Sequence, residues 1–458
     1  MMTLAALARA IGAEYRGKDI PLPEVSIDSR NIKPGEMFVA LKGPNFDGAQ
    51  FVDEVIKKGA GALMVNRAVD ADIPQIIVAD TRLGLGHLGS AWRKQFKIPV
   101  IALTGSCGKT STKEMIAAIL REKGPAIATQ GNLNNDFGVP LTLLRLRPEH
   151  EFAVIEMGTN SVGEIAYLTK IAQPTAALIT NIGASHLQGL GGYEGVSREK
   201  SDIFLGLSGR GIAVINNDEA FSQSWKAKID TSHQVSYGIY NRSDVMAENP
   251  HSGPDGISFT LKTPIGNREV AVPLLGEHIV YNALAAVATT LSVGVGLEHV
   301  ARGLAGVKPV DGRFKPYKLP NGALLIDDTY NASANAVKNA MKTLGKYNGK
   351  RIFVMSNMGE MGEFAQQVHS DMGHWAVEFN LDHLFLAGNS PELLQATLAA
   401  CDQRAEYFTD KAALTARLLP LLGANTMVVV KGSRGNKMEE VVAALLKAAG
   451  IQYETHHH

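Results

Sequence analysis

The chain has 458 residues, which is too long for one hydrophobic core and suggests two to four domains. Lysine plus arginine and aspartate plus glutamate each total 45, so no net charge favours a nucleic acid or an anionic membrane as partner. No apolar run is long enough to span a bilayer, and the first residues lack the pattern of a signal peptide. Because two cysteines alone make neither a disulfide framework nor a zinc site, we expect a cytoplasmic protein.

Residues 1–82 are predicted to form a small N-terminal α/β domain. Helical patterns cover residues 4–11 and 51–58, and strand patterns cover residues 25–30, 37–41, 62–65 and 76–78. Two polar clusters lie in the predicted loops or at strand ends, namely Asp28-Ser29-Arg30 and residues 45–48 with Asp47. Asparagine, aspartate and glycine favour turns in any case, so these clusters predict turns as readily as a binding site.

The most informative segment is residues 99–112. An apolar, strand-like run turns through Gly105-Ser106-Cys107-Gly108 and continues from Lys109-Thr110-Ser111 with a helical pattern. The glycines let backbone N–H groups approach a phosphate, and a helix N-terminus adds partial positive charge. Lys109 is expected to reach the β- and γ-phosphates of ATP, and the Thr110 hydroxyl to bind Mg²⁺. The motif is a short form of the P-loop, because Leu103 stands where the general pattern has its first glycine.

Residues 83–312 are predicted to form a central ATPase domain with a mostly parallel sheet. Strands and helices alternate there, which favours helices on both faces of such a sheet. Predicted strands cover residues 152–157 and 176–180, and predicted helices cover residues 83–96, 163–172, 196–207 and 279–293. Residues 245–275 read instead as an antiparallel appendage, because two strand patterns flank a turn-like segment.

Three residues of this domain are candidate metal ligands. Glu156 ends a predicted strand beside the P-loop strand, where a carboxylate could bind Mg²⁺ or simply face solvent. His186 follows the next strand and could hold a second metal ion, although a lone histidine is more often structural. From its local pattern, Lys200 is a solvated lysine on a helix.

Residues 313–455 are predicted to form a C-terminal Rossmann-like α/β domain, after a linker at residues 307–312. Its predicted strands are residues 324–326, 352–355, 384–386 and 427–430, and its last helix is residues 437–449. Asn282, Arg313, Asp328 and the segment Lys431–Arg434 could contact a nucleotide, but ordinary surface polarity is the more common explanation of such residues, and Asn282 could equally cap a helix. Residues 456–458 are three histidines, which we interpret as the remnant of a purification tag.

Taken together, these signals resemble the Mur ligase family, ATP-dependent ligases of peptidoglycan synthesis. The P-loop, the Glu156 strand, Asn181 with His186, the helix at Asn282 and Asp328-Thr329-Tyr330-Asn331 occur in the family's order. Residues 131–140, 358–362 and 431–434 are most similar to the branch that adds D-alanyl-D-alanine to UDP-N-acetylmuramoyl-tripeptide. That branch usually has aspartate where this chain has Asn357, which concerns the dipeptide pocket.

The resemblance implies ATP and two Mg²⁺ ions as cofactors, and an acyl phosphate as the intermediate of C–N bond formation. Lys109 and Thr110 would hold the phosphates and one Mg²⁺, Glu156 would bridge both ions, and His186 with a carbamylated Lys200 would hold the second. The nucleotide would also contact Gly105, Ser106, Cys107, Gly108, Ser111, Asn282, Arg313 and Asp328. The implied substrate residues are Ser29, Arg30, Asp47, Asn134, Asn135, Lys431, Ser433 and Arg434.

Several alternatives stay open from the sequence, and one of them is another ligase of the Mur type. A folylpolyglutamate-type ligase shares the P-loop and the chemistry, but the asparagine-rich segment 131–140 and the N-terminal domain count against it. A nucleotide-sensing binding protein is the other alternative, and three metal-ligand candidates in chain order count against that. We expect a monomer, and the third residue of the peptide substrate could be diaminopimelate or lysine.

Overall fold

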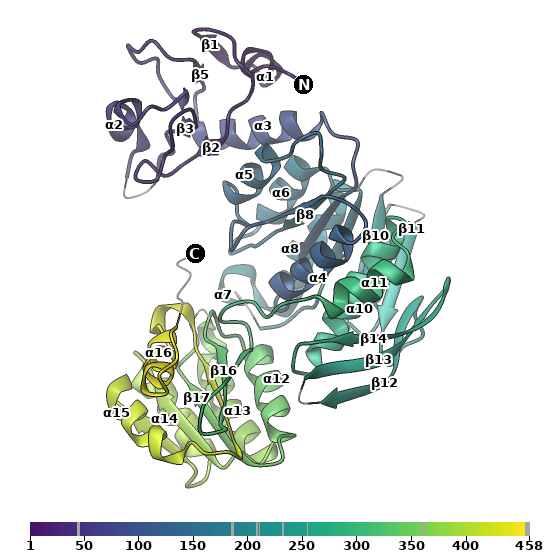
Figure 1. Cartoon of the computed structure of the whole chain (residues 1–458), viewed down its shortest axis with the longest axis vertical. Helices are drawn as coiled ribbons and strands as arrows, with labels where there is room; N and C mark the ends of the chain where they lie inside the picture. The colour runs from purple at the N-terminus through teal and green to yellow at the C-terminus, as the bar shows by residue number, and fades with distance from the viewer. Residues whose placement is uncertain are drawn as a thin grey trace.

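The computed structural model describes residues 1–43, 46–184, 187–207, 209, 211–230, 233–253, 255–359 and 361–453. The chain forms three α/β regions in a row, and each is built on its own sheet (Figure 1). The first sheet ends at Ile77, the second spans Val100–Val272 and the third begins at Lys315. Domain boundaries after residues 82 and 312 stay a prediction, and the first of them falls near the start of helix α3 (Thr81–Arg93).

The N-terminal sheet has the strand order β1-β5-β4-β3-β2. Its elements are α1 (Leu4–Ala10), β1 (Glu14–Arg16), β2 (Val25–Ser26), β3 (Met37–Val39), α2 (Val52–Lys57), β4 (Ala62–Val65) and β5 (Gln75–Ile77). The strand predicted over residues 25–30 ends at Ser26, because an oxygen of Asp28 accepts the backbone N–H of Arg30 at 2.9 Å and closes a turn. The three-residue strand β1 was not predicted.

The central sheet has the order β14-β13-β12-β11-β10-β9-β6-β8-β7. Its strands are β6 (Val100–Thr104), β7 (Ala126–Ala128), β8 (Phe152–Glu156), β9 (Ala176–Ile179), β10 (Ile212–Asn216), β11 (His233–Gly238), β12 (Val245–Gly253), β13 (Gly256–Thr263) and β14 (Gly266–Val272). Pairing is parallel from β7 to β12 and antiparallel from β12 to β14, so the predicted antiparallel appendage is present. The P-loop strand β6 therefore lies inside the sheet, between β8 and β9.

Helices cover both faces of the central sheet, as the alternation predicts (Figure 1). They are α3, α4 (Lys109–Arg121), α5 (Gly138–Leu144), α6 (Glu164–Ala172), α7 (Leu187–Leu190), α8 (Gly192–Ser201), α9 (Ser222–Lys228), α10 (His278–Ser292) and α11 (Leu297–Ala305). Ala102 of β6 belongs to one buried cluster and its neighbours Ile101 and Leu103 to another. A parallel strand that is buried on both faces needs an unbroken run of apolar residues, and for this reason β6 could be predicted from the sequence.

The third sheet has the order β15-β16-β20-β17-β18-β19 and is parallel except for the edge strand β15. Its strands are β15 (Lys315–Lys318), β16 (Leu324–Asp328), β17 (Lys350–Met355), β18 (His383–Ala387), β19 (Ala405–Phe408) and β20 (Thr426–Lys431). Its helices are α12 (Ala334–Gly345), α13 (Ala365–Glu378), α14 (Pro391–Ala400), α15 (Lys411–Leu418) and α16 (Glu439–Ala448). Short 3-10 turns lie at Gly48–Phe51, Asp202–Gly206, Gly362–Phe364, Leu419–Leu421 and Arg434–Asn436.

Ion pairs, in addition to the linker, connect the third region to the central region. Glu277, just before α10, pairs with Lys342 of α12 at 2.9 Å and also with Lys346, which directly follows α12. Cys107 of the P-loop lies 2.9 Å from the Ser333 hydroxyl, which precedes α12. The phosphate loop therefore contacts the third region directly. None of the described helices is long and apolar enough to cross a membrane.

Arg93 ends α3 and is a buried positive charge that joins two helices. Its guanidinium donates to the carbonyl oxygens of Phe96, Ala172 and Gln173 at 2.6, 3.1 and 3.2 Å, and burial lowers its pKa. Replacement by methionine removes these donors and leaves the carbonyls without them, so we expect the free energy of unfolding to fall by about 3 kcal/mol. Urea unfolding measures this. Lys94→Met, at the next, exposed position, is the control, and equal midpoints for the two variants would contradict the assignment.

Candidate active site

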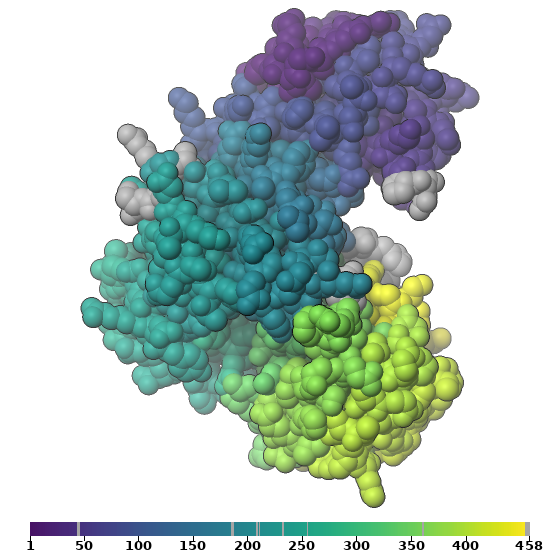
Figure 2. All heavy atoms as spheres, turned by 180° about the vertical axis from the view of Figure 1, so that it is seen from behind, coloured from purple at the N-terminus to yellow at the C-terminus, as the bar shows by residue number. Residues whose placement is uncertain are grey.

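A cavity of ≈ 1040 Å³ lies where the central and third regions meet. Its walls are the P-loop, the ends of β8, β9 and β10, the first turns of α10, and segments of the third region around Asp328 and Lys431. The carboxyl ends of parallel strands are the usual place for ligands in such sheets. Figure 2 shows from behind how the N-terminal region stands apart from the third region, with open space between them beside the central region.

The P-loop turns on two glycines. Gly105 has φ +152° and Gly108 has φ +77°, and Gly108 directly precedes α4. A Cβ on Gly105 would lie 1.9 Å from the Thr180 hydroxyl, and a Cβ on Gly108 would lie 2.5 Å from the Asn282 side-chain oxygen. No larger residue fits at either position, so both glycines are fixed by backbone conformation and close approach.

Asn181 holds the phosphate loop in shape. Its side-chain oxygen accepts the backbone N–H of Cys107 at 2.9 Å, and its side-chain nitrogen donates to the Cys107 carbonyl at 3.0 Å. The Thr180 hydroxyl donates to the same carbonyl at 2.6 Å. Thr180 and Asn181, the two residues that follow β9, therefore hold the P-loop in place by hydrogen bonds. The sequence pattern did not predict this structural role.

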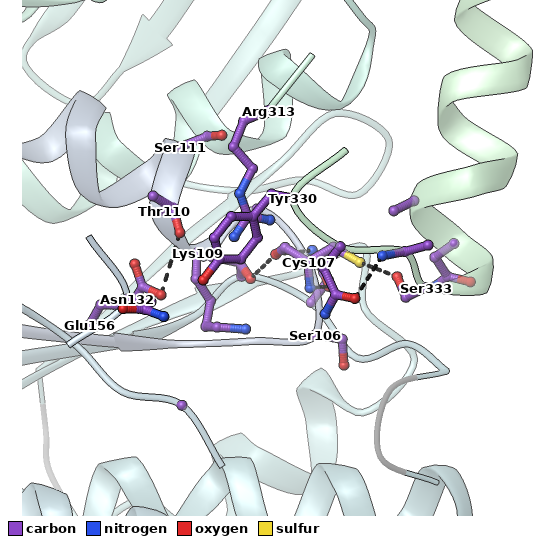
Figure 3. Close-up of a pocket in the computed structure, with 18 of the residues that line it drawn as sticks. Ser106, Cys107, Lys109, Thr110, Ser111, Asn132, Glu156, Arg313, Tyr330 and Ser333 are labelled. Carbon is purple, nitrogen blue, oxygen red and sulfur yellow. Dashed lines mark hydrogen bonds between the residues drawn. The ribbon is translucent and has the colours of Figure 1, made fainter. Parts of the chain in front are cut away.

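The Lys109 side chain folds back onto the P-loop, where it is expected to bind a phosphate. Its Nζ donates to the Gly105 carbonyl at 2.7 Å, and burial lowers its pKa, with the charge of Glu156 acting in the opposite direction. The amine therefore lies inside the P-loop, where a phosphate would be gripped. Figure 3 shows Lys109 and Thr110 at the start of α4, with the Thr110 hydroxyl directed toward Glu156.

Glu156 ends β8, and its two carboxylate oxygens have different surroundings. One carboxylate oxygen accepts hydrogen bonds from the Thr110 hydroxyl at 3.4 Å and from the Asn134 side chain at 2.8 Å. The other oxygen is buried and has no hydrogen-bond partner among the described residues. A buried carboxylate oxygen next to a P-loop threonine fits a Mg²⁺ ligand, since Mg²⁺ binds one or two protein oxygens together with substrate phosphates and water. Within the described ranges, no group of three or more His, Cys, Asp or Glu residues could hold a metal ion.

Lys200 lies on α8 and is 1% exposed, so the prediction of a solvated lysine is wrong. The neighbouring Glu199 fixes the helix, because its carboxylate accepts the backbone N–H groups of Gly163 and Ile165 at 2.7 and 2.8 Å. Burial, and secondly the charge of Lys109, lower the pKa of Lys200 to about 7. A buried amine of this pKa is partly neutral near neutral pH. His186, the other predicted ligand, lies outside the described residues.

The depressed pKa of Lys200 gives a test on the folded protein. Between pH 7 and the ordinary pKa of 10.5 the unfolded chain binds more protons at this lysine than the folded chain, so its burial destabilises the fold more as pH falls. We expect Lys200→Met to raise the melting temperature, and to raise it more at pH 7 than at pH about 9.5. Thermal melts in CO₂-free buffer measure this, and an equal shift at both pH values would contradict the burial of a charged amine.

On the third region, three basic residues have different surroundings. Lys431 is 2% exposed and is neutralised by Asp328 at 2.6 Å, so it fixes the turn after β16. Arg313 stacks over the Tyr330 ring at 3.9 Å, beside the P-loop (Figure 3). Arg434 lies 5.8 Å from the same ring, pairs with Glu439 at 3.4 Å and is exposed. The arginines are therefore more accessible to anionic ligands than Lys431, which is buried against Asp328.

Asn357, the position at which the sequence departs from the resembled branch, braces the third sheet. Its side-chain oxygen accepts the backbone N–H groups of Asn389 and Ser390 at 3.0 and 3.3 Å, and its backbone carbonyl accepts the Ser433 hydroxyl at 3.0 Å. An amide oxygen performs this role as an aspartate oxygen would. The departure thus keeps the wall of the cavity in place.

Most of the predicted site residues from the central and third regions lie on this one cavity. They are Ser106, Cys107, Gly108, Lys109, Thr110, Ser111, Asn134, Asn135, Glu156, Lys200, Asn282, Arg313, Asp328, Lys431, Ser433 and Arg434. Gly105 forms the base of the loop without lining the cavity, and Ser29, Arg30 and Asp47 lie in the N-terminal region, off its walls. Asn282 is in the second turn of α10, so it is not the helix cap that was the alternative.

Several lining residues were not predicted. Tyr330 and Ser333 lie within or next to the segment 328–331 that the sequence already marked, so extending that segment would have found them. His278 lines the cavity with a buried Nδ1 that has no hydrogen-bond partner among the described residues, and burial lowers its pKa to about 4. Arg82 and Asp136 also line it, and their pairing joins segments far apart in the chain.

Comparison with known proteins places the whole chain in one family. The description "Mur ligase family, catalytic domain" matches residues 22–104, "Mur ligase middle domain" matches residues 103–290, and "Mur ligase, glutamate ligase domain" matches residues 312–434. The chain is 43% identical over 448 residues to the UDP-N-acetylmuramoyl-tripeptide--D-alanyl-D-alanine ligase of Escherichia coli K12, covering 97% of this chain and 98% of that protein.

Solved structures also match this chain over nearly its whole length. The crystal structure of MurF from Acinetobacter baumannii superposes with a TM-score of 0.89 at 38% identity, covering 96% of this chain and 98% of that one. MurF ligase from Thermotoga maritima in complex with ADP superposes with a TM-score of 0.82 at 26% identity, covering 94% and 98%. These matches confirm the predicted fold class of three α/β domains.

Proposed function

This chain belongs to the Mur ligase family, and we propose that it joins D-alanyl-D-alanine to a UDP-N-acetylmuramoyl-tripeptide with hydrolysis of ATP. The reaction forms a C–N bond, releases ADP and phosphate, and serves peptidoglycan synthesis, and with it cell-wall biogenesis, cell shape and cell division. The observation that carries the proposal is the 43% identity, over 97% of the chain, to the UDP-N-acetylmuramoyl-tripeptide--D-alanyl-D-alanine ligase of Escherichia coli K12. The cavity supports it, because the P-loop, Glu156 and Lys200 face one space.

The proposed reaction has two steps. The terminal carboxylate of the tripeptide attacks the γ-phosphorus of ATP, the bond to the β-phosphate oxygen breaks, and an acyl phosphate forms. The neutral amine of D-alanyl-D-alanine then attacks the acyl carbon, phosphate leaves, and the amine proton passes to solvent or a base. The Lys109 amine and the N–H groups of the P-loop would stabilise negative charge as the phosphoryl group transfers. The walls from two domains would keep water from the acyl phosphate.

Two Mg²⁺ positions are part of the proposal. Thr110 and Glu156 would hold one ion, and Glu156 would share the second with His186 and Lys200. Bound Mg²⁺ would neutralise phosphate charge and orient the triphosphate. The buried, unpartnered oxygen of Glu156 supports the first position.

We also propose that Lys200 is carbamylated. Its neutral amine would attack CO₂, which forms an N–C bond and releases one proton, and leaves an anionic oxygen ligand in place of a cation. The burial of Lys200 beside Lys109 supports this, because both depress its pKa and leave more of the amine neutral. A carbamate oxygen is the kind of ligand that Mg²⁺ prefers.

The substrates are assigned to three places. Ser29, Arg30 and Asp47 would bind the UDP end in the N-terminal region, and Asn134 and Asn135 would contact the peptide. Lys431, Ser433 and Arg434 belong to the proposed dipeptide subsite. Exposure favours Arg434 as the partner of the dipeptide carboxylate, since Lys431 is buried against Asp328.

Phosphate release tests the function. We expect the purified protein to release phosphate from ATP only when UDP-N-acetylmuramoyl-tripeptide and D-alanyl-D-alanine are both present. Release with a folate substrate and glutamate would favour the folylpolyglutamate alternative, and ATP binding without release under any condition would favour a nucleotide sensor. We further propose a cytoplasmic monomer; both cysteines are free, as expected in a reducing compartment. Light scattering coupled to gel filtration measures the monomer.

A further inference from the structure

One ion pair on the cavity wall has no role in the chemistry proposed above. Arg82, in the first turn of α3, pairs with Asp136, just before α5, with an Nη2 to Oδ1 distance of 2.7 Å. The Arg82 side chain is 46% exposed and Asp136 is 25% exposed, and both line the same cavity as the P-loop. The guanidinium also lies 5.8 Å from the ring of Phe137. The pair is therefore held in place but open to a ligand.

The pair lies a short distance from the reacting centre. Asn134 donates to Glu156 at 2.8 Å, and Asp136 is only two residues further along the same loop. Two residues of extended chain span at most about 7 Å. Glu156 and the ion pair are therefore connected through one short loop on the wall of the same cavity.

The lining between these two points is neutral apart from one acid. Asn132, Asn134, Asn135, Thr159 and Asn160 carry amides or a hydroxyl. Glu164 also lines this part, but one of its oxygens accepts the backbone N–H groups at residues 160 and 161. Of the described lining residues in segments 132–136 and 158–168, none is a lysine or arginine. Arg82 is thus the cation that an anionic group in this part of the cavity would meet.

We propose that the Arg82–Asp136 pair binds the far end of the third residue's side chain in the peptide substrate and selects an end that carries both an amine and a carboxylate. This inference rests on the proposed function, in which the third residue presents the carboxylate that is activated. Diaminopimelate ends in an ammonium and a carboxylate, and lysine ends in an ammonium alone. Arg82 would bind that carboxylate through two N–H groups, and Asp136 would bind the ammonium.

Charge explains the selectivity. A zwitterionic end places each of its charges against the opposite charge of the pair. A lysine ammonium would also attract Asp136 but would bring a like charge to Arg82 with nothing to offset it. Tyr167 lies behind the pair and does not line the cavity, and burial first and the charge of Asp136 second raise its pKa.

Three matched tripeptide substrates test the proposal. Their third residues are diaminopimelate, lysine, and diaminopimelate with its far carboxylate converted to the amide. We expect kcat/KM of the unmodified protein to be at least about tenfold higher for diaminopimelate than for the other two, which corresponds to about 1.4 kcal/mol. Arg82→Gln should bring the three values to within about twofold of one another. Dissociation constants of the nucleotide-sugar tripeptides, measured without ATP, should follow the same pattern.

The controls separate recognition from folding and from the proposed function. Arg67→Gln, at an exposed arginine of the N-terminal region, should keep the preference, and melting temperatures report whether each variant folds. Equal kcat/KM for the three substrates with the unmodified protein would overturn this inference alone. An Arg82→Gln variant that loses activity while keeping the preference would also overturn it, because that result indicates a structural role. No phosphate release with any of the three would overturn the proposed function and this inference with it.

Discussion

Replacing Lys109 by methionine is expected to lower the rate of phosphoryl transfer by about three orders of magnitude, which corresponds to about 4 kcal/mol of transition-state stabilisation. The amine lies inside the P-loop, 2.7 Å from the Gly105 carbonyl, where the phosphate is expected to bind. Methionine keeps the length of the side chain and removes only the charge and its donors. Single-turnover phosphate release, with both peptide substrates present, measures the loss.

The control for Lys109 lies just beyond the same helix. Lys123 follows the end of α4, is exposed, and lies outside the cavity. Lys123→Met should keep the unmodified rate. Near-normal turnover of Lys109→Met would remove the P-loop from the proposed mechanism, whatever the affinity of the protein for ATP.

Replacing Lys200 by alanine is expected to abolish most of the ligase activity, with a loss of at least about a hundredfold, because the carbamate ligand would be lost. Bicarbonate cannot restore the variant, since it has no amine to modify. A short-chain carboxylate such as acetate or propionate should restore part of the rate, because it fits the space left by the side chain and supplies the missing anionic oxygen. Phosphate release over a range of carboxylate concentrations measures this rescue.

Arg198 offers the matched control for Lys200. It is exposed on the same helix α8, two residues away, and does not line the cavity. Arg198→Ala should keep its activity and respond to neither bicarbonate nor acetate. Full activity of Lys200→Ala would contradict the carbamate, and a loss that no carboxylate repairs would show that the lysine acts by another route.

Part of the central sheet was predictable, because three of its strands are simple in composition. β6, β8 and β9 are buried on both faces and therefore consist of short apolar runs, which also reveals the P-loop that follows β6. Short strands were missed for the opposite reason. β1 has three residues, and β19, at the edge of its sheet, is half-buried throughout, so neither shows a distinct pattern.

The site was partly predictable, and Lys200 shows where prediction from local pattern fails. Its neighbours Ser197, Arg198 and Glu199 are polar, so nothing local indicates a buried helix face. Its burial comes from tertiary contacts, among them the hydrogen bonds of Glu199 to the start of α6. The family resemblance supplied what the local pattern could not. The Arg82–Asp136 pair could not be predicted from local pattern either, because it joins residues that are 54 positions apart in the sequence.

The ion pairs of Glu277 have a consequence for how the ligands influence one another. Glu277 links the start of α10 to α12, and Asn282, one turn further along α10, lies against the P-loop glycine Gly108. A rotation of the third region would therefore pull on the helix that borders the nucleotide. Occupancy of the dipeptide subsite and affinity for ATP should then be thermodynamically linked, each tightening or weakening the other by the same factor.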